Sequence, residues 1–211
     1  MEGYLLVKLD DVLKKKTEDE TKNILSTFEN NLNSDVDNFL HCKAIEFSKK
    51  GLSKTQLVLA SYKNKYEIAG YFTIANKNFS VKSRSKAISN TMRKRIAKFG
   101  TYEPNFKIYV ITAPLIAQLG KNTRFPSLIT GDELLELACK EVEKVQAVVG
   151  GKIVYLECED NEKLKEFYSR NGFVAFDKRL LDADEEVDFK GKYLVQMLKY
   201  LHYHYHLFLC I

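Results

Sequence analysis

The sequence lacks the features that mark several broad classes of protein. It contains no run of about 18 consecutive apolar residues, so we expect no membrane-spanning helix. Its N-terminus has only a short apolar stretch, residues 4–7, before acidic residues follow, so we expect no signal peptide. Internal repeats and low-complexity linkers are also absent. With 211 residues and 45% hydrophobic content, the chain is long enough for one domain with a sizeable core.

Cysteine and histidine are scarce, and their spacing argues against common catalytic and metal centres. The four cysteines show neither CxxC spacing nor a grouping typical of metal ligands, which predicts a reducing, cytoplasmic environment. Cys139 and Cys158 lie in apolar contexts and are predicted to be small core residues. There is no GxSxG motif, and three of the four histidines lie near the C-terminus. We therefore expect no Ser/His or Cys/His nucleophile centre.

We interpret residues 1–200 as a single domain and residues 201–211 as a His- and Tyr-rich apolar tail. In the tail His202, His204 and His206 recur at spacing two, so a strand would place them on one face. Metal binding is one interpretation, but no carboxylate accompanies them, and an edge strand of alternating His and Tyr is the plainer one. We expect no metal. The apolar end of the tail is expected to pack on the domain or on a partner subunit of a homodimer.

Hydrophobic periodicity indicates a mixed α/β (α+β) chain. Strands are predicted at residues 4–7, 55–62, 66–75, 106–118 and 192–200, and helices at 18–30, 34–49, 83–98 and 132–149. Pro114 cannot donate to a sheet ladder, so its strand is expected to have a bulge or an edge there. The elements do not repeat as strand–helix pairs. This order predicts a mixed sheet flanked by helices rather than a parallel wound sheet.

The segment after residue 151 is the most informative one. Residues 152–158 are short, β-branched and closed by acids, which predicts a buried strand ending in a polar turn. Asn161 can then cap a short helix that residues 171–172, Asn-Gly, would stop. The apolar side of this helix consists of Leu164, Phe167 and Tyr168. Residues 173–176 begin another strand, so the segment forms a strand–helix–strand unit.

This unit, with Tyr168 four residues before Gly172-Phe173, closely resembles the last part of the cofactor domain in the GNAT acyltransferase superfamily. The predicted element order also resembles that of the superfamily, apart from an extra basic helix between the third and fourth strands. The resemblance covers roughly residues 35–200. It implies a mixed, mostly antiparallel central sheet flanked by helices, and transfer of an acyl group from acyl-CoA, usually acetyl-CoA, to an amine.

The resemblance assigns the CoA pyrophosphate to the loop before the helix that begins at Asp132, because helix N-termini bind anions. The superfamily's loop pattern is degenerate here, since Pro126 and Ile129 occupy its first two positions and only Gly131 matches. Asp132 also suits a plain helix cap. We expect cofactor contacts from the backbone of Gln118, Leu119 and Gly120, and from Lys121, Arg124, Ile129, Thr130, Gly131 and Asp132.

The resemblance also indicates the catalytic groups. Tyr168 would protonate the departing thiolate, while its alternative role is that of a core aromatic on an amphipathic helix. Asn161 would contact the cofactor or simply cap its helix. Glu157 and Glu159 end a strand at the expected acceptor pocket, point to the same side, and are candidate bases for the amine. Water could also accept that proton.

Residues 83–98 contain six basic residues and no acid: Arg84, Lys86, Arg93, Lys94, Arg95 and Lys98. Ile88, Met92 and Ile96 recur every four residues, which predicts a helix with one buried ridge. The basic face is either merely solvated, or binds the CoA 3′-phosphate, or binds an RNA acceptor through Arg84, Arg93, Lys94 and Arg95. The last alternative comes from the resemblance, because some GNAT toxins acetylate the amine of aminoacyl-tRNA.

Together these patterns predict a cytoplasmic N-acetyltransferase that moves the acetyl group directly from acetyl-CoA to an amine. Two other classes stay open. The chain could be a non-catalytic GNAT-like domain that binds CoA or a partner, as the degenerate loop suggests. It could also be a small RNA-binding module, although its basic segment shows no stacking aromatics beside it.

Overall fold

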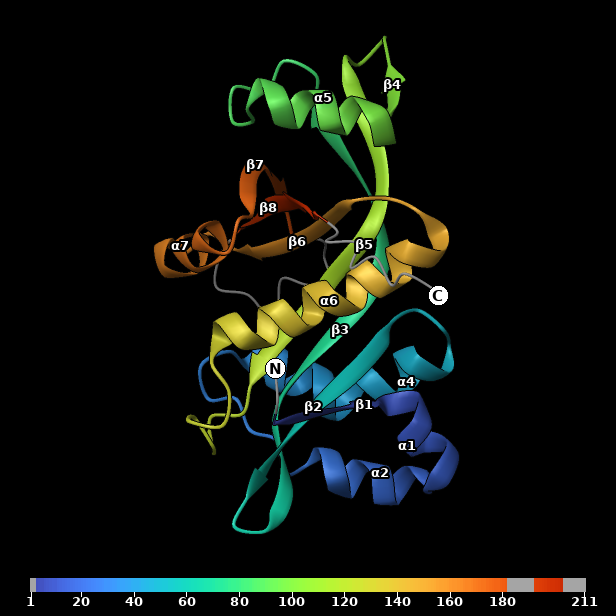
Figure 1. Cartoon of the computed structure of the whole chain (residues 1–211), viewed down its shortest axis with the longest axis vertical. Helices are drawn as coiled ribbons and strands as arrows, with labels where there is room; N and C mark the ends of the chain where they lie inside the picture. Colours follow the sequence, from blue (N-terminus) through green and yellow to red (C-terminus); the bar gives the residue numbers. More distant parts are fainter. Residues whose placement is uncertain (1–2, 182–191, 203–211) are drawn as a thin grey trace, which may run out of the picture.

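The computed structural model describes residues 3–181 and 192–202 (Figure 1). Along the chain its elements are β1 (Tyr4–Lys8), α1 (Leu9–Lys15), α2 (Glu18–Leu25), α3 (Ser34–Asn38), the π-helical turn η1 (Phe39–Lys43), α4 (Ala44–Lys49), β2 (Lys54–Tyr62), β3 (Lys65–Lys82), α5 (Asn90–Phe99), β4 (Thr101–Glu103), β5 (Ile108–Lys121), α6 (Gly131–Val149), β6 (Ile153–Glu159), α7 (Glu162–Arg170), β7 (Val174–Leu180) and β8 (Tyr193–Tyr200). The described part thus alternates strands and helices without a regular βα repeat.

One sheet runs through the molecule in the order β1-β2-β3-β5-β6-β8-β7, with β4 paired to β5 beside this path. All neighbouring strands are antiparallel except β5 and β6, which are parallel. The predicted fold class, a mixed and mostly antiparallel sheet flanked by helices, is therefore confirmed. The extra helical segment between the third and fourth long strands is also present, as α5.

The parallel strands β5 and β6 diverge soon after they meet. They pair only at Leu115 with Tyr155 and at Ile116 with Leu156. The register between β3 and β5 shifts at this point, leaving Ala117 as an additional residue in β5. Such a bulge bends its strand and increases the local twist. Beyond it β5 continues along β3 while β6 continues along β8, so a V-shaped opening separates their ends.

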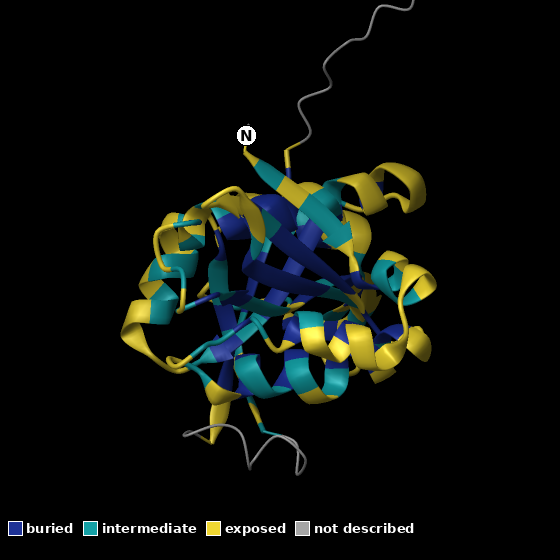
Figure 2. Cartoon of the chain, turned by 90° about the horizontal axis from the view of Figure 1, so that it is seen from below, coloured by how far each residue is buried: buried dark blue, intermediate teal, exposed yellow. Residues whose placement is uncertain are grey.

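Three hydrophobic clusters support the sheet. One lies beneath α6 and α7, a second beneath α1 to α4, and a third beneath α5. Figure 2 shows the strands buried at the centre, with the exposed surface on the surrounding helices and loops. Alternate residues of a strand point to opposite faces, so Val154, Leu156 and Cys158 enter the α6 cluster while Ile153 and Tyr155 enter the α5 cluster.

The predicted start of the basic helix is wrong. The basic helix begins at Asn90 rather than at residue 83, because Ser89 caps it by accepting a hydrogen bond from the Met92 N–H at 3.1 Å. The predicted ridge of that helix is confirmed, since Ile88, Met92 and Ile96 are all buried. Pro114 lies where β5 has neither β4 nor β6 beside it, so the expected edge is confirmed.

Candidate active site

The opening between β5 and β6 leads into a cleft of about 640 Å³. One wall comes from the helical segment of α3, η1 and α4, and the other from α7 and the end of β6. The π-helical turn lies in the first wall, where Phe39 and Lys43 line the cleft together with Phe47 of α4. π-Helical turns within α-helices occur frequently at functional sites. The cleft is therefore the candidate active site.

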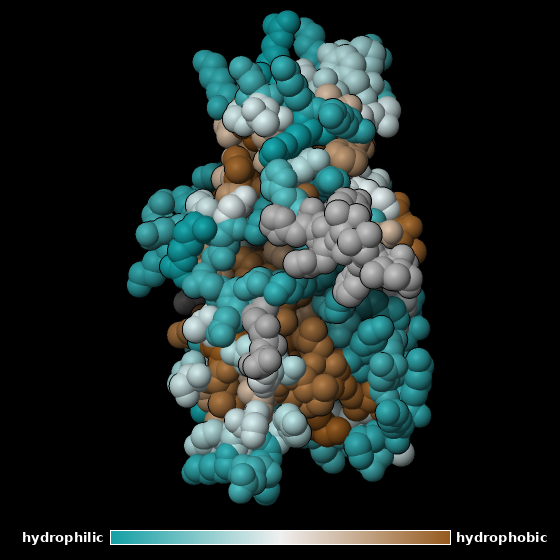
Figure 3. Space-filling model, in the orientation of Figure 1, coloured by the Kyte–Doolittle hydropathy of each residue, from teal (hydrophilic) through white to brown (hydrophobic). Residues whose placement is uncertain are grey.

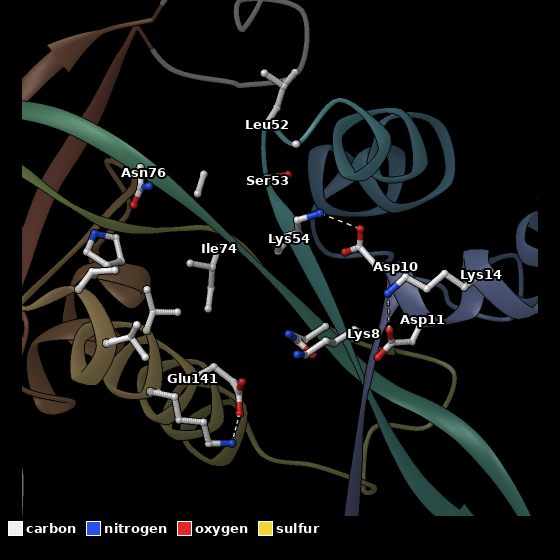
Figure 4. A pocket seen from close by; sticks show the side chains of 18 residues that line it. Lys8, Asp10, Asp11, Lys14, Leu52, Ser53, Lys54, Ile74, Asn76 and Glu141 are labelled. Carbon is white, nitrogen blue, oxygen red and sulfur yellow. Dashed lines mark hydrogen bonds and ion pairs between the residues drawn. The ribbon is translucent and has the colours of Figure 1, made fainter.

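A larger hollow of about 780 Å³ lies elsewhere, between α1, the start of β2 and the C-terminal half of α6. Figure 3 shows hydrophobic side chains gathered between α6 and β1. Most charged groups of this hollow are paired with each other, as in Lys54 with Asp10 at 2.7 Å and Lys144 with Glu141 (Figure 4). None of the predicted site residues lines it. It therefore offers no group for the predicted chemistry.

Tyr168 of α7 lines the cleft. Its ring packs edge-on against Phe173, with 6.0 Å between the ring centroids, and its hydroxyl has no hydrogen-bond partner among the described residues. Burial, together with the nearby Cys158, raises the pKa of Tyr168. A phenol is already protonated at neutral pH at its ordinary pKa of 10, so the upward shift holds the proton in place and makes Tyr168 a weaker acid than a free phenol. The helix is oriented by Asn161, whose side chain accepts a hydrogen bond from the Lys163 N–H at 2.9 Å.

Glu157 does not resemble a free base. Arg179 of β7 donates to its two carboxylate oxygens at 2.8 and 2.6 Å, and the Tyr155 hydroxyl donates to it as well. Gln196 of β8 donates to that hydroxyl at 2.7 Å, which completes a network at the cleft floor. Burial alone would raise the pKa of Glu157, but Arg179 and Tyr155 outweigh burial and lower it. Its predicted role as a base is therefore disfavoured by its geometry.

Glu159 is held far less tightly. It points to the same side as Glu157 and, among the described residues, accepts one hydrogen bond, from the Asn33 side-chain amide at 3.3 Å. Asn33 caps α3, and two residues on, the nearly buried Asp35 accepts from the Gln118 side-chain amide at 2.8 Å. These two contacts join α3 to β6 and to β5 across the cleft. Glu159 is thus the predicted base that its surroundings leave more available.

Within residues 3–181 and 192–202, no strand pairs with the backbone of β5 beyond Ile116 on the side facing β6. It is therefore available for the expected pairing with a pantetheine arm. Gly120, however, has a different reason to be glycine than room for a ligand. A Cβ there would lie 2.3 Å from Val36 Cγ1 and 3.2 Å from the Tyr71 ring. Glycine allows α3 to approach β5 closely, and so helps to position the cleft wall.

The N-terminus of α6 is capped by its own side chains. Thr130 and Glu133 form a capping box, in which Glu133 accepts from the Thr130 N–H at 2.8 Å and the Thr130 hydroxyl accepts from the Glu133 N–H at 3.2 Å. Asp132 accepts hydrogen bonds from Asn171 at 2.6 Å and from Arg170. The hydrogen bond from Asn171, then Arg170, lowers the pKa of Asp132. Carboxylates thus stand where an anion site was expected.

The other predicted loop residues are placed as follows. Ile129 is buried in the core, so only its backbone faces the loop. Gly131 lines the cleft and lies against Phe167. A Cβ on Gly131 would lie 3.1 Å from Phe167 Cε2. Lys121 also lines the cleft and donates to the Pro126 carbonyl at 3.0 Å. Arg124 follows on the same loop but is not among the residues lining the cleft.

Sequence reasoning missed Asn33, Asp35 and Arg179. The Asn33 cap carries a local signal, because an Asn before Ser-Asp and an apolar helix is typical of a helix start. Arg179 carries none, because its contact with Glu157 depends on β8 inserting between β6 and β7. No group of three or more His, Cys, Asp or Glu side chains suited to a metal occurs in residues 3–181 and 192–202. His204 and His206 lie outside these ranges. No described helix is long and apolar enough to cross a membrane.

Searches against protein-family models and against curated proteins find no match. Solved structures do match. AtaT complexed with acetyl-methionyl-tRNAfMet superposes with a TM-score of 0.60 at 15% identity, over 92% of this chain and 93% of that one. A tyrosine-to-phenylalanine mutant of KacT gives 0.59 at 15% identity, over 92% and 94%. AtaTR bound with acetyl-CoA gives 0.53 at 15% identity, over 92% and 93%. The chain therefore has the GNAT fold.

Proposed function

We propose that this protein is an acetyl-CoA-dependent N-acetyltransferase, with the thioester seated in the opening between β5 and β6. The observation that supports this most directly is the unpartnered Tyr168 hydroxyl in a cleft formed by two diverging parallel strands. The acetyl-CoA complex of AtaTR, which has the same fold, supports the choice of donor. AtaT and KacT have both been solved as tyrosine-to-phenylalanine mutants, which is consistent with a functional tyrosine in proteins of this fold.

In the proposed reaction, an amine nitrogen attacks the thioester carbonyl and a carbon–nitrogen bond forms. The tetrahedral intermediate then collapses, the carbon–sulfur bond breaks, and the sulfur leaves with the bonding pair. Tyr168 donates its proton to this sulfur as negative charge develops on it, because the protonated phenol lies in the cleft with no other hydrogen-bond partner among the described residues. The phenolate recovers a proton from solvent. The products are an amide and free CoA.

The proton lost by the amine goes to Glu159 or to water. Glu159 is the preferred residue because a single 3.3 Å contact with Asn33 holds it, whereas Arg179 clamps both oxygens of Glu157. Glu157 then has a positioning role. Its network with Tyr155 and Arg179 fixes the end of β6 and therefore the direction of Glu159.

The residues fit the donor better at its thioester end than at its phosphate end. The free edge of β5 at Gln118, Leu119 and Gly120 suits the pantetheine amides. At α6, the N–H groups of Gly131 and Asp132 stay outside the capping box and suit the pyrophosphate, with Lys121 and Arg124 nearby. Ile129 and Thr130 would contact the cofactor through the loop backbone. Asn161 would contact it from the start of α7.

Calorimetric titration with acetyl-CoA tests the proposal, with release of free CoA in the presence of an amine as the second readout. We expect binding and a rise in melting temperature, because a ligand that binds only the native state stabilises it. The non-catalytic alternative has a specific observation in its favour, namely the carboxylates that cap α6. Binding without any acyl transfer would support it, and no binding at millimolar acetyl-CoA would refute the proposal altogether.

The acceptor amine is a separate matter. AtaT complexed with acetyl-methionyl-tRNAfMet supports an aminoacyl-tRNA as acceptor, over a small amine or a protein amine. Incubation with labelled acetyl-CoA and total aminoacyl-tRNA should yield labelled RNA. Deacylated tRNA is the matched control, because it keeps the same nucleic acid and lacks the amine. Equal labelling of polyamines or peptides would favour the other acceptors. The homodimer and the cytoplasmic location stay predictions.

A further inference from the structure

The net charge of the chain is concentrated in one segment, residues 83–107, which connects β3 to β5. This segment holds seven of the 33 basic residues and one of the 28 acidic residues, a net charge of +6 against +5 for the entire chain. The rest of the sequence is therefore almost neutral. A local excess of this size creates a positive field at one end of the molecule, which attracts polyanions.

The cations of this segment have no carboxylate partners within the part of the chain that the structure describes. Many basic residues elsewhere do, and the neighbouring Lys82 pairs with Asp177 at 2.8 Å. Five of the seven side chains are exposed: Arg84, Lys86, Lys94, Lys98 and Lys107. The buried ridge of α5 fixes the opposite side of the helix on the sheet. The outer face thus carries positive charges that no carboxylate of the described residues neutralises.

Aromatic rings lie exposed on the same segment. Phe99, Tyr102 and Phe106 are 39%, 46% and 76% exposed. Tyr102 of β4 pairs with Tyr109 of β5, with 5.1 Å between their ring centroids. The expectation that no stacking aromatics accompany the basic residues is therefore wrong. Phe99 ends α5, Tyr102 lies in β4, and Phe106 lies in the turn between β4 and β5; β4 lies beside α5 (Figure 1).

Helix and strand form one rigid piece. At their junction a Cβ on Gly100 would lie 2.9 Å from Ile111 Cγ1 and 3.2 Å from Tyr109 Cβ, so the chain passes close to β5. The piece also adjoins the candidate active site, because Phe79 beneath α5 stacks on Tyr155 at 4.2 Å and Tyr155 hydrogen-bonds Glu157. A chain of contacts through the core thus links the sheet beneath α5 to Glu157 of the cleft.

We propose that residues 83–107 bind unpaired RNA, with phosphates on the cations of α5 and bases stacked on the rings of Tyr102 and Phe106. Positive charge attracts any nucleic acid, whereas exposed rings add binding energy only with bases that are unpaired and can stack on them. Both features together favour a single strand over a duplex. The inference rests on the proposed function and deepens it by naming the surface that holds the acceptor RNA, and its test requires no acetyl transfer.

Fluorescence anisotropy with a labelled single-stranded RNA of about 12 nucleotides tests this, since such platforms span roughly 4–16. Removing two charges with K94Q/K98Q should weaken binding and lower the slope of log K against log salt by about 0.7 per lost phosphate contact. Phe106→Ser should weaken binding by roughly 5- to 150-fold and leave the salt slope unchanged. A duplex of equal length should be insensitive to Phe106→Ser.

Matched controls lie at the other end of the molecule. K15Q/K16Q removes the same charge from α1 and the residue after it, and Tyr66→Ser removes a ring that is 66% exposed on the β2–β3 hairpin. Neither should change RNA affinity more than about twofold. Equal losses in control and test variants would overturn the proposal, as would binding to anionic lipid vesicles without binding to RNA.

The acetyl-CoA melting shift, measured on the same variants, separates this inference from the proposed function. A retained shift with no RNA binding by the wild-type protein would refute the inference alone. RNA binding that depends on Lys94, Lys98 and Phe106, with no acetyl-CoA shift, would support the inference and refute the acetyltransferase.

Discussion

Replacing Gly120 by alanine should destabilise the protein through one contact. The added Cβ would lie 2.3 Å from Val36 Cγ1, far inside van der Waals contact. The φ of Gly120 is not positive, so no backbone strain accompanies the change and the effect is purely steric. Overpacking of this kind costs about 1–3 kcal/mol. The smaller backbone entropy of the unfolded alanine chain offsets up to about 1 kcal/mol of that.

A double-mutant cycle tests the reasoning. Val36→Ala alone should cost about 2 kcal/mol, because two buried carbons and their packing are lost. In the Gly120→Ala background the same change removes the clash, so the double mutant should be about 1–2 kcal/mol more stable than the sum of the single effects predicts. Urea denaturation, with m unchanged, gives all four stabilities. Additivity within about 0.5 kcal/mol would refute the steric account.

Four further outcomes are expected. Tyr168→Phe should keep the fold and the acetyl-CoA affinity but lower turnover about 10²-fold, measured as kcat on one amine; unchanged kcat would leave the tyrosine a packing residue. Arg179→Met should cost about 3–5 kcal/mol in urea denaturation by leaving the Glu157 charge unpaired, while Glu157→Gln with Arg179→Met should recover part of it. The lowered pKa of Glu157 stabilises the fold above the carboxyl's ordinary value of 4.5, so wild-type stability should fall below that pH more steeply than that of Glu157→Gln. Glu133→Gln should tighten acetyl-CoA binding in calorimetry, because it keeps a capping acceptor and removes a carboxylate beside the phosphates; weaker binding would contradict the proposed phosphate site.

The sequence sufficed for elements whose signals are local. The apolar stripe of residues 132–149 predicted α6 almost to the residue, and the Asn-Gly at residues 171–172 ended α7 as expected. Strand β3 was predicted to stop at residue 75 but continues to Lys82. Three consecutive polar residues, 76–78, end the apolar run there, and Phe79 and Val81 beyond them are buried in the cluster beneath α5.

The candidate site was predictable only in part, for the same physical reason. Tyr168 and Glu159 follow from position within one strand–helix–strand unit. The partners that separate Glu159 from Glu157 come from distant segments, Asn33 at the start of α3 and Arg179 on β7. Such contacts depend on strand order and on how closely α3 approaches β5, and no local spacing encodes them. The capping box at Thr130 was readable from its Thr-x-x-Glu pattern, and it competes with the expected anion site.

The short meeting of β5 and β6 divides the sheet into two plates. Two residue pairs join them, at Leu115 and Ile116, so the joint resists bending far less than the extended ladder between β3 and β5. Helix α5 spans this joint, because its cluster contains Phe79 from one plate and Phe176 and Leu198 from the other. The packing beneath α5 therefore reinforces the sheet at the place where the two halves share the fewest backbone pairs.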